Sequence, residues 1–121
     1  MYESGENYLE TIFVLHKRNG SVRSIDIARE LDFSKPSVSR AVGILKDSGY
    51  IIVDEHGLIN LTDEGREKAE SIFERHQLLT AFLMKTAKVS EEVAEEDACK
   101  IEHVISDDTI QGIKNYLRNS L

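Results

Sequence analysis

The sequence predicts a mainly α-helical protein with one small β-hairpin near its middle. Apolar side chains recur every three or four positions through most of the 121 residues, which is the period of an amphipathic helix. Residues 50–53 form instead a short run of β-branched and aromatic side chains, which is typical of a strand. Helix-capping and turn-forming residues separate these segments, so the ends of the elements can be predicted as well.

Two helices are expected before residue 34. The first helix starts after Ser4 and ends at residues 19–20, an Asn-Gly pair that tolerates the left-handed conformation of a helix stop. Ser24 is the expected N-cap of a short second helix, which breaks at residues 32–33.

A third helix is expected from Ser34, which can cap it. Pro36 is harmless in the first turn because its missing N–H would have no partner there. Val38, Val42 and Leu45 share one face and are expected to point inward. The polar side chains of this helix should therefore face outward.

The hairpin consists of a strand at residues 50–53, a turn at 54–57 and a returning strand at 58–61. Thr62 then caps a long helix that runs to about residue 88. Ser90 caps a further helix to about residue 104, and Ser106 caps a last one to about residue 117.

This order of elements is that of a winged helix-turn-helix followed by a helical half. In a winged helix-turn-helix, a helical pair joined by a tight turn precedes a two-stranded hairpin, the wing. We expect residues 1–62 to form the DNA-binding domain and residues 63–121 to form a helical domain for metal binding and dimerisation.

The charge distribution qualifies what the net charge implies. A formal net charge of −7 by itself argues against a nucleic-acid partner. From Lys17 to Gly49, however, seven basic residues outnumber four acidic ones, so this part carries +3 and the remainder −10. Such a chain can bind DNA with one part and cations with the other, whereas solvated helix faces of random sign are the alternative.

Composition also indicates the compartment. Cys99 is the only cysteine, so no intrachain disulfide can form and a reducing compartment fits best. No apolar stretch is long enough to span a membrane, and the N-terminus lacks the regions of a signal peptide. We expect a cytoplasmic protein with no membrane partner.

The third helix is the expected DNA-reading element, because an α-helix fits the major groove and its first turns can reach base edges. Lys35 and Lys46 are suited to phosphates, while Arg40 can read guanine with both arms of its guanidinium. A three-helix domain that contacts only proteins is the alternative. The expected DNA-binding residues are Arg23, Ser34, Lys35, Pro36, Ser37, Ser39, Arg40 and Lys46.

Cys99, Glu102 and His103 form a candidate metal site. Their i, i+3 and i+4 spacing puts a thiolate, a carboxylate and an imidazole on one face of a helix. All three groups bind first-row divalent metals. A buried cysteine beside a solvated Glu-His pair has the same spacing and is the alternative.

Three further residues favour the metal interpretation. Asn7 and Glu10 are spaced i and i+3 near the start of the first helix. His76 lies at the edge of the apolar face of the long helix, where a polar imidazole needs a partner. A helical bundle can bring these helices together around one site, as in carboxylate-histidine metal proteins.

Five stretches of the chain resemble one known family. They are residues 6–12 (ENYLETI), 34–39 (SKPSVS), 61–65 (LTDEG), 75–79 (RHQLL) and 97–106 (DACKIEHVIS). In these stretches the chain resembles the iron- and manganese-dependent repressors of the diphtheria toxin repressor and manganese transport regulator type. The resemblance extends over nearly the whole chain.

The resemblance implies a homodimer, joined through its C-terminal helices, that represses transcription. It implies binding to palindromic double-stranded operator DNA when loaded with Fe(II) or Mn(II), one or two ions per subunit, and thereby control of metal homeostasis. The implied primary site consists of Asn7, Cys99, Glu102 and His103. The implied second site uses His76 and, as in manganese-type members, Glu10.

The chain departs from both branches of that family. Asn7 stands where iron-type members commonly have Met and manganese-type members have Asp. Cys99 follows the iron type, and a thiolate favours Fe(II) over Mn(II). Thr80 and Glu95 replace a carboxylate and a histidine of the iron-type ancillary site, so Glu95 is an open candidate ligand. The chain also ends without the SH3-like third domain of longer members.

Two other functions are alternatives to a metal-dependent repressor. A winged-helix regulator could sense a small organic ligand or the oxidation of Cys99. The second alternative is a metal-dependent hydrolase, but the sequence shows no separate general base or substrate pocket. We therefore expect no enzymatic activity.

Overall fold

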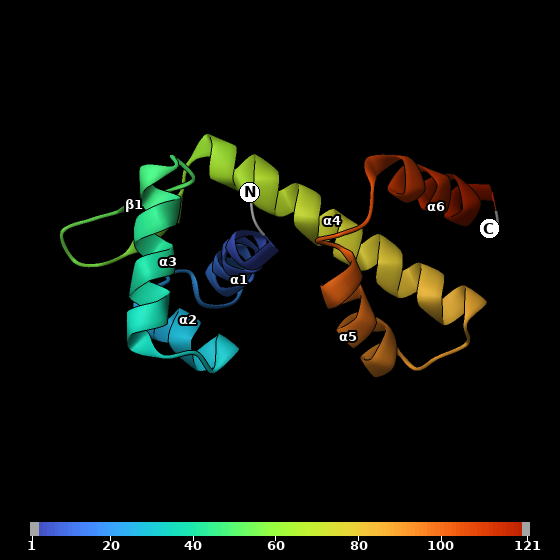
Figure 1. Cartoon of the computed structure of the whole chain (residues 1–121), viewed down its shortest axis with the longest axis horizontal. Helices are drawn as coiled ribbons and strands as arrows, with labels where there is room; N and C mark the ends of the chain where they lie inside the picture. The colour runs from blue at the N-terminus through green and yellow to red at the C-terminus, as the bar shows by residue number, and fades with distance from the viewer. Residues whose placement is uncertain (1–2, 120–121) are drawn as a thin grey trace. The chain divides into compact units, whose positions relative to one another are not determined.

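A computed structural model describes residues 3–119 as six α-helices and one two-stranded hairpin (Figure 1). In chain order these are α1 (Glu3–Asn19), α2 (Ser24–Leu31), α3 (Lys35–Asp47), β1 (Ile51–Val53), β2 (Ile59–Leu61), α4 (Asp63–Thr86), α5 (Glu91–Ile101) and α6 (Asp107–Asn119). The predicted mainly α fold with a two-stranded wing is confirmed. None of these described helices is long and apolar enough to cross a membrane.

The chain divides into two compact units. The first ends at Glu70 and the second begins at Ser71, so the boundary lies inside α4. The first unit contains α1, α2, α3, the wing and the start of α4. The second contains the remainder of α4 with α5 and α6. The expected division of function at residue 62 stays a prediction.

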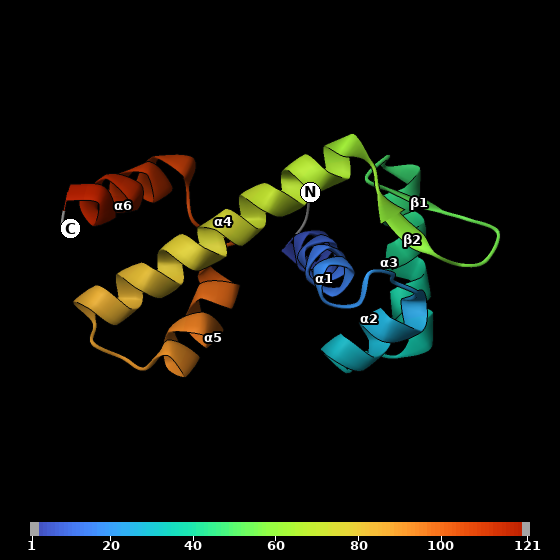
Figure 2. The same ribbon diagram turned by 180° about the vertical axis from the view of Figure 1, so that it is seen from behind.

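The first unit packs three helices and the wing around one core (Figure 2). α1 contacts α2, α3 and β2, while α3 also contacts α2 and β1. The strands are antiparallel, with Ile51 opposite Leu61 and Val53 opposite Ile59. Each strand begins one residue later than predicted. The largest fully buried apolar side chains of this unit are Leu9, Ile12, Val22, Ile27, Val38, Ile51 and Ile59.

Most of the predicted helix caps are confirmed. The hydroxyl oxygens of Ser34, Thr62, Ser90 and Ser106 accept backbone N–H bonds at 3.1–3.3 Å from the residue three positions later. The prediction of Ser24 as an N-cap is wrong, because α2 begins at Ser24 itself. Instead, the carboxylate of Asp26 accepts the backbone N–H of Arg23 at 2.9 Å and closes the first turn.

The second unit has an apolar core of its own, to which each of its helices contributes. Leu79 of α4, Ala98 of α5 and Ile113 of α6 are buried together. The rings of Phe82 and Tyr116 meet edge-on across α4 and α6, with centroids 5.7 Å apart. The side chains that pack around this core are Phe82, Ile101, Ile105, Ile110 and Leu117.

Helix α5 is shorter than predicted. It ends at Ile101 rather than near residue 104, and Glu102 is its C-cap. The N–H groups of Val104 and Ile105 both donate to the carbonyl of Ile101, at 3.0 Å each, which closes a turn where the helix would continue. His103 therefore lies in this turn, and the expected continuous helical face from residue 99 to residue 103 does not form.

Gly65 provides a test of the packing between the start of α4 and the wing. A Cβ at this position would lie 1.9 Å from the carbonyl oxygen of Tyr50, a contact that the backbone must move to avoid. Gly65→Ala should lower the free energy of unfolding by about 2 kcal/mol or more.

Gly43→Ala in α3 is the matched control because nothing lies within 4 Å of its Cβ. This control should gain about 0.5–1 kcal/mol from helix propensity. Equal unfolding free energies of the two variants in urea titrations would contradict the prediction.

The turn of the wing should depend on pH through Asp54. The backbone N–H of Leu58, at 2.9 Å, and that of His56, at 2.8 Å, donate to this exposed carboxylate and hold its pKa below the usual 3.8. A lowered pKa in the folded state means that the stabilisation is present above pH 3.8 and is lost as the pH falls through the folded value. An NMR titration should show the amide of Leu58 becoming exposed to exchange in that acidic range. In Asp54→Ala this pH-dependent change should disappear; if it persists, another group controls the turn.

Candidate functional site

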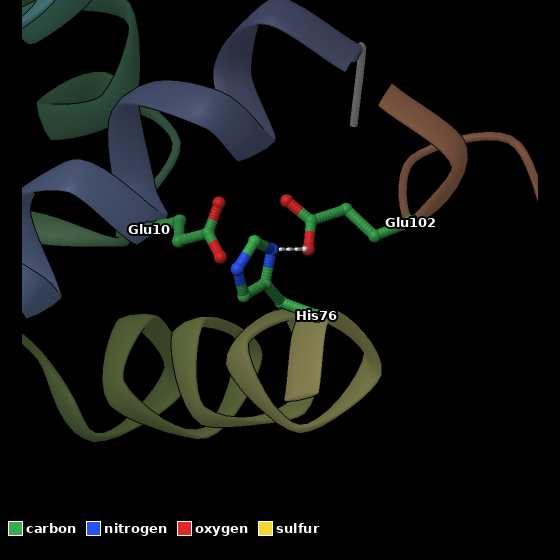
Figure 3. A group of neighbouring side chains, drawn as sticks. All are labelled: Glu10, His76 and Glu102. Atoms are coloured by element: carbon green, nitrogen blue, oxygen red, sulfur yellow. Dashed lines mark ion pairs between the residues drawn. The ribbon is translucent and has the colours of Figure 1, made fainter. Parts of the chain in front are cut away.

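Glu102 is a fully buried carboxylate of the second unit, with 0% of its surface exposed. Its backbone N–H donates to the carbonyl of Ala98 at 2.9 Å, which fixes the residue at the end of α5. Its Oε2 lies 3.2 Å from Nδ1 of His76, and its Oε1 lies 3.4 Å from Nε2 of His103 (Figure 3 draws the first pair). The carboxylate is therefore enclosed between two imidazoles.

Local packing explains why these side chains turn inward. Ile72 and Leu79 lie four residues before and three residues after His76, and both are almost completely buried. His76 consequently shares the inward face of α4. The side chains of His76 and His103 are 20% and 3% exposed, so water has little access to the nitrogen atoms that face Glu102.

The donor set fits a divalent transition-metal ion. Neither carboxylate oxygen of Glu102 accepts a hydrogen bond from the residues that the structure describes. A buried carboxylate is costly unless it is paired and hydrogen-bonded. Imidazole nitrogen and carboxylate oxygen are ligands of Fe(II), Mn(II) and Zn(II), so an ion between them would supply the missing interaction.

Arg75, the residue before His76, holds the turn that follows α5. Its Nη1 donates to the carbonyl of Ile105 at 3.0 Å and, more weakly, to that of Glu102 at 3.4 Å. Its Nη2 forms an ion pair with Asp107 in the first turn of α6. The sequence alone does not single out this residue, since its only signal is its position beside a candidate ligand.

The other predicted ligands belong to the exposed face of α5 or to the first unit. Cys99 is exposed on α5, and no group of three or more candidate ligands in the described part of the chain includes it. Glu95 is exposed as well. Asn7 and Glu10 belong to α1 in the first unit, where Asn7 is half-buried and Glu10 is 8% exposed. Within the second unit, His76 and His103 each lie beside Glu102, and these are three of the six predicted ligands.

The predicted DNA-reading residues are all exposed, at the surface of α3 or next to it. Ser34 uses its hydroxyl to cap α3 and donates to the hydroxyl of Ser37 at 2.8 Å. Arg23 donates from Nε to the carbonyl of His56 at 3.3 Å, so it links the segment before α2 to the wing. Lys46 and Arg40 extend from α3 into solvent.

One exposed residue of α3 was missed. Ile44 is 60% exposed although it is a large apolar residue. The signal was present in the sequence, because position 44 falls outside the inward stripe formed by Val38, Val42 and Leu45. An apolar side chain on a major-groove helix can contact the methyl group of thymine.

Two models of known protein domains match the chain, one in its N-terminal part and one in its C-terminal part. Residues 1–57 match the iron dependent repressor N-terminal DNA binding domain. Residues 62–120 match the iron dependent repressor metal binding and dimerisation domain. The chain belongs to the iron-dependent repressor family. Its members are metal-responsive, DNA-binding transcriptional repressors, and the resemblance found in the sequence is confirmed.

Individual transcriptional regulators are similar to this chain over most of its length. An uncharacterized HTH-type transcriptional regulator of Methanocaldococcus jannaschii is 30% identical over 118 residues, which are 97% of this chain and 94% of the relative. The transcriptional regulator MntR of Escherichia coli is 33% identical over 109 residues, or 90% of this chain and 70% of MntR. A solved manganese-dependent transcriptional repressor in complex with manganese is 26% identical with a TM-score of 0.86. That match covers 93% of this chain and 52% of the solved one.

Proposed function

We propose that this chain is a repressor whose DNA binding is switched on by Fe(II) or Mn(II) at a site built on His76, Glu102 and His103. The observation that carries the proposal is the buried carboxylate of Glu102, which faces two imidazoles and accepts no hydrogen bond from a described residue. Bound there, the ion supplies positive charge and directional coordination to three side chains that come from α4 and the end of α5.

Glu10 is the proposed ligand from the first unit. Its carboxylate offers an oxygen donor of the same kind as that of Glu102, and position 10 matches a ligand of the manganese-type family members. Asn7, one helical turn earlier on α1, and Cys99 complete the proposed ligand set, for one or two ions per subunit. An ion that takes donors from both units restricts how the DNA-reading unit is held.

The nitrogen and oxygen donors suit Mn(II) better than a thiol ligand would. His76, Glu102, His103 and Glu10 offer only nitrogen and carboxylate oxygen, which suit Mn(II) as well as Fe(II). The preference for iron inferred from the sequence depended on Cys99, and this residue is exposed. Metal titrations should therefore compare Mn(II) with Fe(II) under anaerobic conditions.

The DNA-binding half, residues 1–62, is proposed to insert α3 into the major groove of an operator. Arg40 would read guanine, Lys35 and Lys46 would contact phosphates, and Ile44 would contact a thymine methyl. In a homodimer joined through residues 63–121, two α3 helices about 34 Å apart match half-sites one helical turn apart, hence a palindromic operator. The chain would act in the cytoplasm, as a regulator of metal homeostasis genes and not as an enzyme.

The metal site is tested by Glu102→Gln, which keeps the size of the side chain and removes its charge. Mn(II) affinity, measured by calorimetric titration of the full chain, should fall by at least about 100-fold, more than the loss of an outer-shell partner causes. The metal-free variant should be no less stable than the wild type, because an uncompensated buried carboxylate is removed.

Glu95→Gln is the matched control, since it makes the same chemical change at an exposed position of α5. It should bind Mn(II) like the wild type. Equal Mn(II) affinity of Glu102→Gln and the wild type would exclude the site. If Cys99→Ser abolished a peroxide response of DNA binding without metal, the thiol-sensing alternative would take its place.

The DNA-reading face is tested with a duplex selected from a random pool by the metal-loaded protein. Arg40→Ala should cost about 1–3 kcal/mol of binding and relax specificity at one base pair. Lys46→Ala should weaken binding to all sequences alike and reduce the slope of log affinity against log salt by about 1. Fluorescence anisotropy at several KCl concentrations distinguishes the two effects. If both variants bound like the wild type, α3 would not be the recognition helix.

A further inference from the structure

Arg75 contacts every element of the second unit that carries or adjoins a proposed ligand. It lies on α4 directly before His76. Its guanidinium reaches the carbonyls of Glu102 and Ile105 and the carboxylate of Asp107. A single side chain thus joins α4, the end of α5 and the first turn of α6.

The carbonyls that Arg75 contacts are groups that need a donor. The last carbonyls of a helix have no intrahelical partner, and the carbonyl of Glu102 stands at the end of α5. A guanidinium is planar and carries several N–H donors in a fixed arrangement, so one arginine can hold two carbonyls at a defined separation. The Arg75 side chain is only 22% exposed, which limits competition from water.

Apolar packing alone does not define this turn closely enough for metal binding. The core of Leu79, Ala98 and Ile113 holds the three helices in contact. Burial of apolar surface is non-directional, however, whereas metal–ligand distances must be met to within about 0.2 Å. Directional hydrogen bonds are needed to orient the turn that carries Glu102 and His103.

We propose that Arg75 is a positioning residue for the metal site. It holds the turn carrying Glu102 and His103 against α4, so that carboxylate and imidazoles meet before the ion arrives. Through Asp107 it also connects the occupied site to the start of α6. This inference rests on the proposed metal function of Glu102.

Two variants of Arg75 separate positioning from general stability. Arg75→Met removes the donors while keeping an extended side chain, and Arg75→Lys keeps the charge without the planar arrangement of donors. Lys114→Met is the matched control. The Nζ of Lys114 pairs with Glu74 Oε1 at 2.7 Å, so this control also removes a cation that links α4 and α6.

The experiment measures Mn(II) affinity by calorimetric titration and the visible absorption of bound Co(II), both on the full chain. Arg75→Met should lose about 10–100-fold in Mn(II) affinity, as outer-shell substitutions do, and shift the Co(II) bands. Arg75→Lys should fall between Arg75→Met and the wild type. Lys114→Met should stay within about twofold of the wild type, since an exposed ion pair contributes little.

Hydrogen exchange gives a second readout, which a merely structural role would not move. The amides of Thr109 and Ile110 donate to the side chain and the carbonyl of Ser106 at the start of α6. Mn(II) should slow their exchange in the wild type and in Lys114→Met, and should leave it unchanged in Arg75→Met.

Three outcomes would overturn the inference or its basis. Wild-type Mn(II) affinity in Arg75→Met, or an equal loss in Lys114→Met, would show that Arg75 does not position the site. If one of these results were found while Glu102→Gln lost Mn(II) affinity in the same series, only the role of Arg75 would be refuted. If Glu102→Gln also bound Mn(II) normally, the proposed metal site would fail with it. Should Arg75→Met not fold, the same comparison is made with Arg75→Lys.

Discussion

The buried carboxylate of Glu102 is the constraint around which the second unit is built. Removing an ionised carboxylate from water is costly, and only well-placed hydrogen bonds or an opposite charge offset the cost. Glu102 accepts no hydrogen bond from any described residue, and its partners are imidazole nitrogens at 3.2 and 3.4 Å. A divalent ion in contact with the carboxylate would remove the penalty. Because a ligand that binds only the folded form stabilises it, metal binding and the stability of this unit are linked.

The apolar core of the second unit makes this linkage stronger. Leu79, Ala98 and Ile113 bring α4, α5 and α6 together and keep water from the side chains between them. In such a medium of low dielectric constant an unpaired charge costs more, and a paired one gains more, than at the surface. The burial of Glu102, which makes its charge unfavourable without a metal, therefore increases the difference in stability between the metal-free and metal-bound states. His76 shares this environment because it lies on the core-facing side of α4.

Features set by neighbouring residues could be predicted from the sequence, and features set by distant contacts could not. The cap at Thr62 and the wing depend on a few consecutive residues, and both were predicted. The cap of α2 was misassigned because Asp26 closes the first turn from inside the helix. The end of α5 was placed too late because Arg75, 27 residues from Glu102, holds the carbonyls there. His76, Glu102 and His103 were identified as candidate ligands by their chemistry. The assignment of Cys99 to the same face assumed that α5 continued to residue 103.

Electrostatic attraction alone does not explain how a metal would activate DNA binding. The chain carries −7, so one divalent ion would still leave it at −5, facing a polyanion. At physiological salt the field of an ion also decays over about 8 Å. The ion must instead change how the DNA-reading residues are held, and this requires a ligand from the first unit. The proposed ligand Glu10 would meet that requirement, because α1, which carries it, contacts both α2 and α3. A ligand shifts a conformational balance only through its differential affinity for the two states. An ion bound by His76 and Glu102 alone would stabilise the second unit and leave operator affinity unchanged.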